Sequence, residues 1–198
     1  MLLTMSALAL LLAPPLPELR TEATDGGSIF HIRNNATQPL TAYFIELVNY
    51  PGSFYQLWQD ETNAAPIPPG GEKHIPNTNM TVGAVPEYVK FQAALFADGS
   101  TAGTPEKVEQ LLERRRHVLA TARELITRLE KSPPATTTDL KQWAGTIPLP
   151  TRTNRNTQAA INNLAAKALI LDTAAKLEKT PPSEALTTLR AAERSLRD

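Results

Sequence analysis

The sequence has 198 residues, with 20 basic and 20 acidic side chains, 17 prolines and no cysteine. The lack of cysteine excludes disulfides, thiolate metal sites and a thiol nucleophile. The neutral net charge argues against a nucleic-acid partner, because coating a polyanion needs concentrated positive charge.

The neutral total hides two oppositely charged parts. Residues 1–103 contain 4 basic and 9 acidic residues, whereas residues 104–198 contain 16 basic and 11 acidic residues. Ten of the eleven aromatic residues lie in the first part, and the second part holds only Trp143. This change in charge and aromatic content along the chain predicts two structural units that meet near residue 103.

The N-terminal segment, residues 1–16, is apolar but shorter than the roughly 20 residues of a membrane span. It resembles the apolar region of a signal peptide, although a positive n-region is absent and the cleavage signal is weak. We therefore expect an exported protein, with residues 17–27 as a linker. The alternative, a buried N-terminal helix, is disfavoured by Pro14, Pro15 and Pro17.

Residues 28–103 are predicted to form short strands. Alternating, β-branched or aromatic residues mark 28–33, 41–48 and 88–97, and weaker candidates are 54–59, 72–75 and 81–85. Turn-forming residues separate these segments. About six short strands at this spacing are typical of an antiparallel β-sandwich.

Several segments of this region also resemble a known kind of protein. They are the strand ending in Asn34 and Asn35, the sequence Gln-Pro-Leu-Thr-Ala-Tyr at 38–43, the sequence Ile-Pro-Pro-Gly-Gly-Glu at 67–72, and Phe-Ala-Asp-Gly-Ser at 96–100 before an arginine-rich helix. Together they resemble exported bacterial proteins in which a small immunoglobulin-like (Ig-like) β domain precedes a helical region. The resemblance covers about residues 28–120. It implies the fold and a periplasmic or extracellular location in a bacterium, but no activity and no catalytic residue.

Helices are predicted after residue 103. Thr104, Pro105 and Glu106 form a helix start, and apolar residues at helical spacing continue to Leu129. A short helix capped by Thr138 or Asp139, a long helix over 154–179 and a last helix from Pro181 and Pro182 follow.

The apolar stripes of these helices must be buried. They could pack on each other, on the β-sandwich, or on a second copy of the chain as a homodimer. We favour the first arrangement. The predicted fold class is therefore α+β, an N-terminal Ig-like antiparallel β-sandwich over 28–103 followed by a C-terminal α-helical hairpin or bundle over 104–198.

Arg115 lies where the apolar stripe of the first long helix would continue, between Leu111 and Val118. It either snorkels to solvent at the edge of the stripe or is buried, in which case its guanidinium needs a carboxylate or several carbonyl groups. The functional interpretation is an interdomain contact with an acidic residue of the β part.

Four aromatic residues cluster around Pro51 and Gly52, and they are Tyr50, Phe54, Tyr55 and Trp58. Aromatic loops can bind carbohydrate or protein. The alternative is that Phe54 and Trp58 belong to the core of the sandwich.

No motif predicts catalysis, a metal or a cofactor. The three histidines, His31, His74 and His117, have no ligand partner at helical spacing except Glu113 with His117, which is more simply a contact on a solvated helix face. Motifs for an activated nucleophile or a phosphate-binding loop are absent from the sequence.

These observations predict an exported, non-catalytic interaction or structural protein whose two halves dock by complementary charge, with an unidentified protein or glycan partner. The first alternative is a carbohydrate- or peptide-binding module that uses Tyr50 to Trp58. The second is an enzyme whose site residues are scattered along the sequence.

Overall fold

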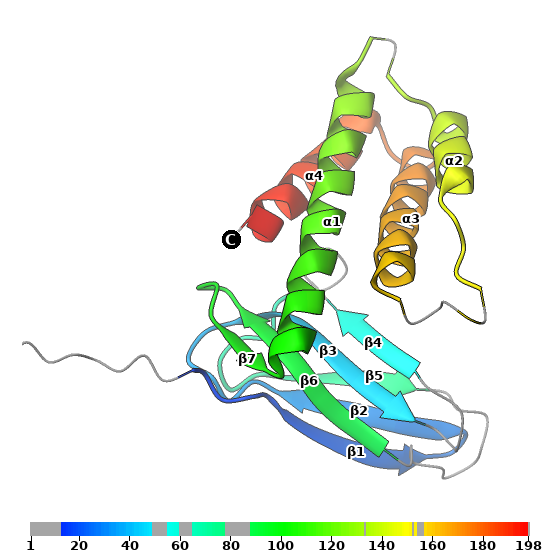
Figure 1. Ribbon diagram of the computed structural model, residues 1–198. Coiled ribbons are helices and arrows are strands. Elements are labelled where there is room, and N and C mark those ends of the chain that lie inside the picture. The colour runs from blue at the N-terminus through cyan, green and yellow to red at the C-terminus, as the bar shows by residue number, and fades with distance from the viewer. Residues whose placement is uncertain are drawn as a thin grey trace, which may run out of the picture.

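A computed structural model describes residues 13–48, 55–59, 65–77, 88–132, 134–151, 153 and 157–197. The strands are β1 (Glu18–Thr24), β2 (Gly27–Arg33), β3 (Leu40–Val48), β4 (Tyr55–Gln59), β5 (Glu72–Asn77), β6 (Tyr88–Phe96) and β7 (Thr101–Gly103). The helices are α1 (Pro105–Glu130), α2 (Thr137–Thr146), α3 (Gln158–Leu177) and α4 (Pro182–Arg197). The protein is thus α+β, with all described strands preceding all described helices (Figure 1).

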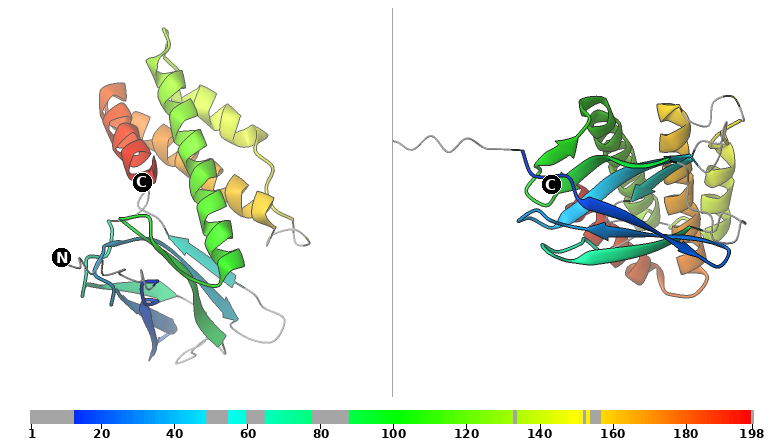
Figure 2. Two further views of the ribbon diagram at one scale, coloured as in Figure 1. Left: turned by 60° about the vertical axis from the view of Figure 1, so that its left-hand side comes forward. Right: turned by 90° about the horizontal axis from the view of Figure 1, so that it is seen from below.

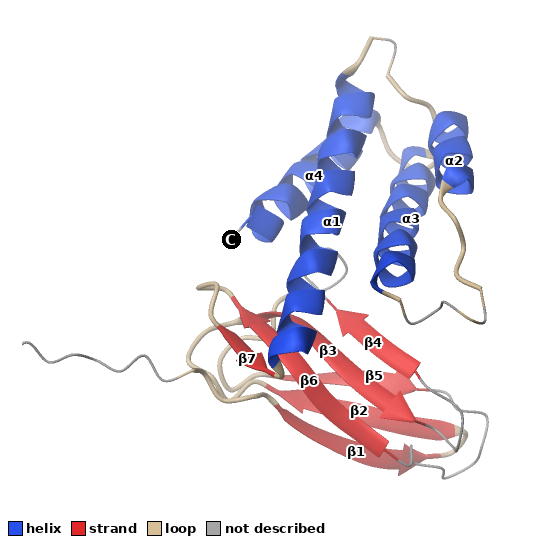
Figure 3. Cartoon of the chain, viewed as in Figure 1, coloured by secondary structure: helices blue, strands red, loops and turns tan. Residues whose placement is uncertain are grey.

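The described elements form three layers (Figure 3). One sheet has the strand order β1-β2-β5 and the other has the order β4-β3-β6-β7, and the paired strands are antiparallel. The helices gather over the β4-β3-β6-β7 sheet, and the β1-β2-β5 sheet is the layer farthest from them. The two sheets therefore have different outer surroundings, a helical layer on one side and solvent on the other.

The first hydrophobic core fills the space between the two sheets. Its buried residues are Ile32, Ala36, Leu40, Tyr43, Ile45, Ile67, Phe91, Ala94, Phe96 and Ala102. Because the side chains of a strand alternate between its two faces, β3 sends Tyr43 and Ile45 into this core and Phe44 to the opposite face. That opposite face is the one on which α1 packs.

Residues 17–27, which the sequence predicts to be a linker, instead contain β1. This strand pairs with β2 along its whole length, from Glu18 opposite Arg33 to Thr24 opposite Gly27. Only Leu19 of the strand packs against the core between the sheets. The strand was missed because its sequence has one large apolar residue, so the apolar alternation that predicts a strand is weak.

Helix α1 contacts both parts of the protein. Its early residue Leu111 is buried with Phe44 and Leu95 of the four-stranded sheet. Its late residues Leu125 and Leu129 lie in a second core, to which α2, α3 and α4 contribute Leu140, Ala144, Ile170, Ala174, Ala185 and Leu189. Figure 2 shows from another side how α1 rises from the sheet into this helical unit. The helices therefore bury their stripes on each other and, through α1, on the sheet.

Two expected helix starts differ in detail. Helix α2 is capped by Thr136 rather than Thr138 or Asp139, and Asp139 completes a reciprocal capping box with Thr136. Thr104 precedes α1 as expected, but its hydroxyl makes no capping hydrogen bond. It donates instead to Oε1 of Gln92 on β6, at 3.2 Å. The Thr104 side chain, which the local sequence predicts to cap α1, thus makes a hydrogen bond to β6 instead.

Several expectations lie outside the described residues. They are the apolar stretch over 1–12, the strand over 81–85 and the start of a helix at 154–156. Within the described ranges, none of the helices has the length and apolar character that a membrane span requires. Leu164 and Leu171 on α3 are exposed, and a homodimer through the helices stays a prediction.

Candidate functional site

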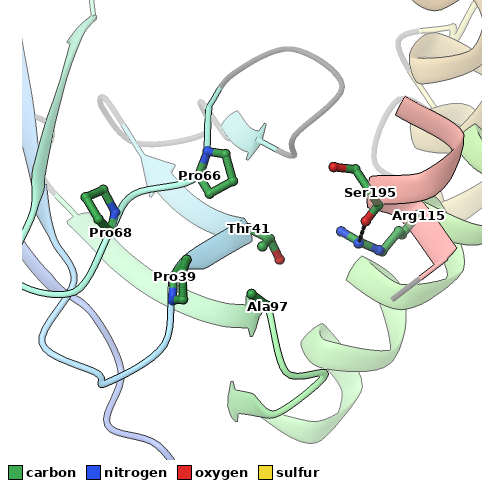
Figure 4. Close-up of a pocket in the computed structure, with 7 residues that line it drawn as sticks. All are labelled: Pro39, Thr41, Pro66, Pro68, Ala97, Arg115 and Ser195. Carbon is green, nitrogen blue, oxygen red and sulfur yellow. Dashed lines mark hydrogen bonds between the residues drawn. The ribbon is translucent and has the colours of Figure 1, made fainter. Parts of the chain in front are cut away.

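The candidate binding site is a groove where the sheets meet the helices. Its volume is about 360 Å³. In Figure 4, strand ends and loops of the β part lie on one side of it, and α1 and α4 lie on the other. The lining residues are Pro39, Thr41, Pro66, Pro68, Ala97, Arg115 and Ser195. Among the residues that the structure describes, the groove, hereafter the junction groove, therefore combines a proline-rich apolar wall with one cationic side chain.

Asn34 holds the proline-rich wall of the junction groove in place. Its fully buried side chain donates through Nδ2 to the carbonyl oxygens of Gln38 at 2.7 Å and Ile67 at 2.9 Å. Its main-chain N–H donates to the carbonyl of Gly71 at 3.0 Å, and its carbonyl accepts from the N–H of Gly70 at 2.8 Å. One asparagine thus ties the loop after β2 to the loop before β5. The sequence indicated only that Asn34 favours a turn.

Arg115 and Ser195 form the helical wall. Arg115 is buried, with 6% of its surface exposed, so it does not snorkel to solvent. Its Nη2 donates to the main-chain carbonyl of Ser195 on α4 (Figure 4). The expected contact with an acidic residue of the β part stays a prediction. Arg114 is buried as well, at 7% exposed, which the spacing of the apolar residues did not indicate.

The predicted aromatic cluster is described only in part. Tyr50 and Phe54 lie outside the described residues. Tyr55 and Trp58 belong to β4, where the pairing with β3 places Tyr55 opposite Leu47 and Trp58 opposite Phe44. β4 is an outer strand of the four-stranded sheet, so this part of the cluster lies at a sheet edge.

Polar side chains connect the sheet and α1 beside the apolar contact. Gln92 on β6 donates through Nε2 to Oε2 of Glu46 on β3 at 2.5 Å, and it accepts from Thr104. Nζ of Lys107 lies 4.0 Å from Oε1 of Glu46 and 5.4 Å from the centre of the Phe44 ring. Among the described residues, this pair of opposite charges accompanies the buried apolar contact, and docking of the two parts by complementary charge stays a prediction.

A second polar group lies on the outer face of the β1-β2-β5 sheet. It consists of His31 on β2 with Glu72 and His74 on β5, whose potential ligand atoms lie within 4.8 Å of one another. The Oε1 atom of Glu72 is 3.1 Å from Nδ1 of His31 and 3.1 Å from Nε2 of His74. The hydrogen bond with His74 is the main cause that lowers the pKa of Glu72, and the bond with His31 adds to it. We name these three residues the His-Glu-His cluster.

This cluster was not predicted from the sequence, because metal ligands were expected there at helical spacing. On a strand the relevant spacing is two, so Glu72 and His74 share one face. The sheet register then places His31 directly opposite His74. The two-residue spacing of Glu72 and His74 could have been recognised in the sequence. The pairing of β2 with β5 could not, because it depends on the tertiary fold.

Comparisons with known proteins give no assignment: no protein family model, no curated protein and no solved structure matches the chain.

Proposed function

We propose that the protein is an exported, non-catalytic interaction protein in which an Ig-like β-sandwich and a helical unit form one rigid body. The observation that carries this proposal is the position of α1. Leu111 near its start is buried against the sheet, and Leu125 and Leu129 near its end are buried among the other helices. A helix anchored at both ends fixes the two parts relative to each other. A scaffold that presents a binding surface at their junction needs this property.

The strand order supports the Ig-like part of the proposal. In a constant-type Ig domain, strands A, B and E share one sheet with D, and strands C, F and G form the other. The order β1-β2-β5 corresponds to A, B and E, and the order β3-β6-β7 corresponds to C, F and G. β4 differs from that pattern because it pairs with β3 instead of joining the first sheet.

The junction groove is the binding surface in this proposal. Its volume lies near the lower end of the roughly 300 to 1,000 Å³ that is usual for ligand pockets. Three prolines and an alanine supply most of the lining, and prolines keep their shape because the ring fixes φ. Such a wall suits apolar side chains of a protein segment, because it offers apolar contact without losing much conformational entropy on binding.

A crosslinking experiment tests the groove. A benzophenone amino acid at Ala97, which is exposed and lines the groove, should give a discrete crosslinked product when the full chain is expressed in a Gram-negative bacterium. The matched control is the same amino acid at Asp172, an exposed position on α3. A product at both positions, or at neither, would contradict binding at the groove. The mass of the product distinguishes a foreign partner from a second copy of this chain.

Export is tested separately by fractionation of the same cells. The full chain should be recovered outside the cytoplasm, and a variant without residues 2–16 should stay inside, because the apolar segment is the proposed signal. Retention of both forms in the cytoplasm would remove export from the proposal. It would leave the binding site unaffected, because the crosslinking readout does not depend on the compartment.

A second candidate function is recognition of a glycan or peptide through the segment from Tyr50 to Trp58. The observation in its favour is that β4, which carries Tyr55 and Trp58, is an outer strand of its sheet. An extended peptide could pair with such an edge as an additional strand. Titration of glycan and peptide panels should then change the tryptophan fluorescence, and Trp58→Ala should abolish the change. Trp143 provides an internal reference, because it is held on α2 with the Arg128 guanidinium 4.3 Å from its ring centre. A change that persists in Trp58→Ala would count against this candidate.

A further inference from the structure

We propose that the His-Glu-His cluster binds one divalent transition-metal ion of the Zn²⁺ class on the outer face of the β1-β2-β5 sheet. The ligands are Nδ1 of His31, one carboxylate oxygen of Glu72 and Nε2 of His74. Two imidazoles with one carboxylate are a donor set that Zn²⁺ and its neighbours in the series accept. Three protein ligands leave a fourth position open to water or to another molecule.

Two of the three separations between the ligand atoms are close to those around a metal ion, and all three lie within 4.8 Å. Zn–N and Zn–O bonds of about 2.0 to 2.2 Å place neighbouring ligand atoms of a tetrahedron about 3.3 to 3.6 Å apart. Oε1 of Glu72 lies 3.1 Å from each of the two histidine nitrogens. The ligand atoms therefore need movements of only a few tenths of an ångström at these two contacts to surround an ion.

The sheet fixes this arrangement. His31 and His74 are directly opposite each other in the antiparallel pair of β2 and β5, and their rings are 4.5 Å apart. Glu72 precedes His74 by two residues and so lies on the same face. The backbone ladder sets the separation of the ligands, which reduces the entropy lost when an ion binds.

Glu22 on β1 supplies an independent observation. Its Oε2 lies 2.8 Å from Nε2 of His31, the ring nitrogen that faces away from the cluster. Metal-binding histidines typically donate this second N–H to a carboxylate, which fixes the tautomer and makes the ligating nitrogen more basic. His31 is nearly buried, with 10% of its side chain exposed, so its ring is held in this orientation.

The surrounding charges permit a cation. Glu22 and Glu72 are the carboxylates in contact with His31. Arg20 stands opposite His31 on β1, but its Nη1 is turned to Oε2 of Glu22 at 3.5 Å. Arg33, opposite Glu72, is exposed. The two glutamates thus offset the two arginines, and imidazoles bind a metal ion in their neutral form.

Isothermal titration of the full chain with ZnCl₂ in a non-chelating buffer tests the proposal. We expect one ion per chain, and a loss of affinity of at least about tenfold in His74→Gln. His74 is the informative position because 60% of its side chain is exposed, so its replacement leaves the fold intact. Glu22→Gln, which removes a group that contacts only His31 within the site, should weaken binding by about 10- to 100-fold.

His117→Gln is the matched control, because His117 is the one histidine of the sequence outside the cluster. It should leave the affinity for Zn²⁺ unchanged. The proposal is overturned if the protein takes up no Zn²⁺ at millimolar concentration. It is equally overturned if His74→Gln binds as tightly as the unaltered chain, because the ion would then lie elsewhere.

Discussion

At the scale of single residues, Gly103 is the most constrained position of the junction. It ends β7 just before α1 with φ of +119°, and a Cβ atom there would collide with the main chain of Gln92 and Ala93 on β6. Gly103→Ala should therefore lower the free energy of unfolding by clearly more than the roughly 1 to 2 kcal/mol that a left-handed conformation costs an L-residue. Urea denaturation measures the loss.

Gly26→Ala is the matched control for this prediction. Gly26 also has a positive φ, +88°, but nothing lies within 4 Å of the position of its missing Cβ. The control should show the conformational cost alone, about 1 to 2 kcal/mol. Equal losses of unfolding free energy in Gly103→Ala and Gly26→Ala would mean that the close approach of β7 to β6 does not restrict position 103.

Arg115 gives a second prediction at this scale. Its buried guanidinium donates to the carbonyl of Ser195 near the end of α4. Arg115→Met keeps most of the aliphatic volume but removes the donors, and it should destabilise the protein by about 1.5 to 3 kcal/mol, as for hydrogen bonds of a charged group. Arg116→Met is the control, because the side chain of Arg116 is 63% exposed. Thermal unfolding that ranks the two variants equally would contradict the structural role of Arg115.

At the scale of elements, the start of α2 shows how a cap depends on pH. The main-chain N–H and then the hydroxyl of Thr136 donate to the carboxylate of Asp139, and these bonds lower the pKa of Asp139. A carboxylate whose pKa is lower in the folded state stabilises the protein above its ordinary pKa. This contribution is lost as the pH falls through the folded-state value.

Asp139→Asn tests this dependence. The variant should be less stable than the unaltered chain at pH 7, and the difference should shrink as the pH falls below the ordinary range of an aspartate. Urea midpoints of the unaltered chain and the variant, measured at each pH, give the difference in stability. The titration of the other carboxylates affects both proteins alike and so cancels in this difference. A difference that is constant with pH would show that the charge of Asp139 does not act in the cap.

The elements also show what the sequence could predict. Helix α1 was predictable, because apolar residues recur at helical spacing from Val108 to Leu129 and Pro105 sets its start. β1 was not, because Leu19 is its one residue that packs against the core and the strand is held by pairing with β2. The cap of α2 was placed two or three residues late, since Thr136, Thr138 and Asp139 are all good capping residues and only tertiary structure selects among them.

The candidate sites were harder to predict than the elements. The junction groove joins residues as distant as Pro39 and Ser195, and the order of the layers that brings them together is not a local property of the sequence. The His-Glu-His cluster depends on the register of β2 with β5. Arg115 could be singled out because a charged residue interrupted an apolar stripe, which is a local signal.

At the scale of the whole molecule, the apolar contact between α1 and the sheet connects the two parts. Leu111 is 1% exposed and packs with Phe44 and Leu95. Leu111→Ala should cost about 2 to 5 kcal/mol, as for other buried leucines. Leu164→Ala, at a position 45% exposed on α3, should be nearly neutral. Calorimetry should also show that Leu111→Ala, unlike Leu164→Ala, broadens or splits the unfolding transition, because it weakens the contact between the parts.

Charge has a smaller role at this scale than the opposite net charges of residues 1–103 and 104–198 suggest. The Lys107–Glu46 pair lies at the junction, with a separation of 4.0 Å. A partly exposed pair contributes at most about 1 kcal/mol and is screened by salt. Burial of Leu111 and its neighbours contributes more, so the contact between the two parts should persist at high ionic strength.

Calorimetric unfolding of the full chain distinguishes one body joined through α1 from two parts that fold separately. We expect a single transition at low and at high salt, with the calorimetric enthalpy equal to the van't Hoff enthalpy, because neither part can lose its structure without exposing the shared apolar contact. Two separate transitions, or one that splits when salt is added, would show that the sheets and the helices fold independently and do not form one body.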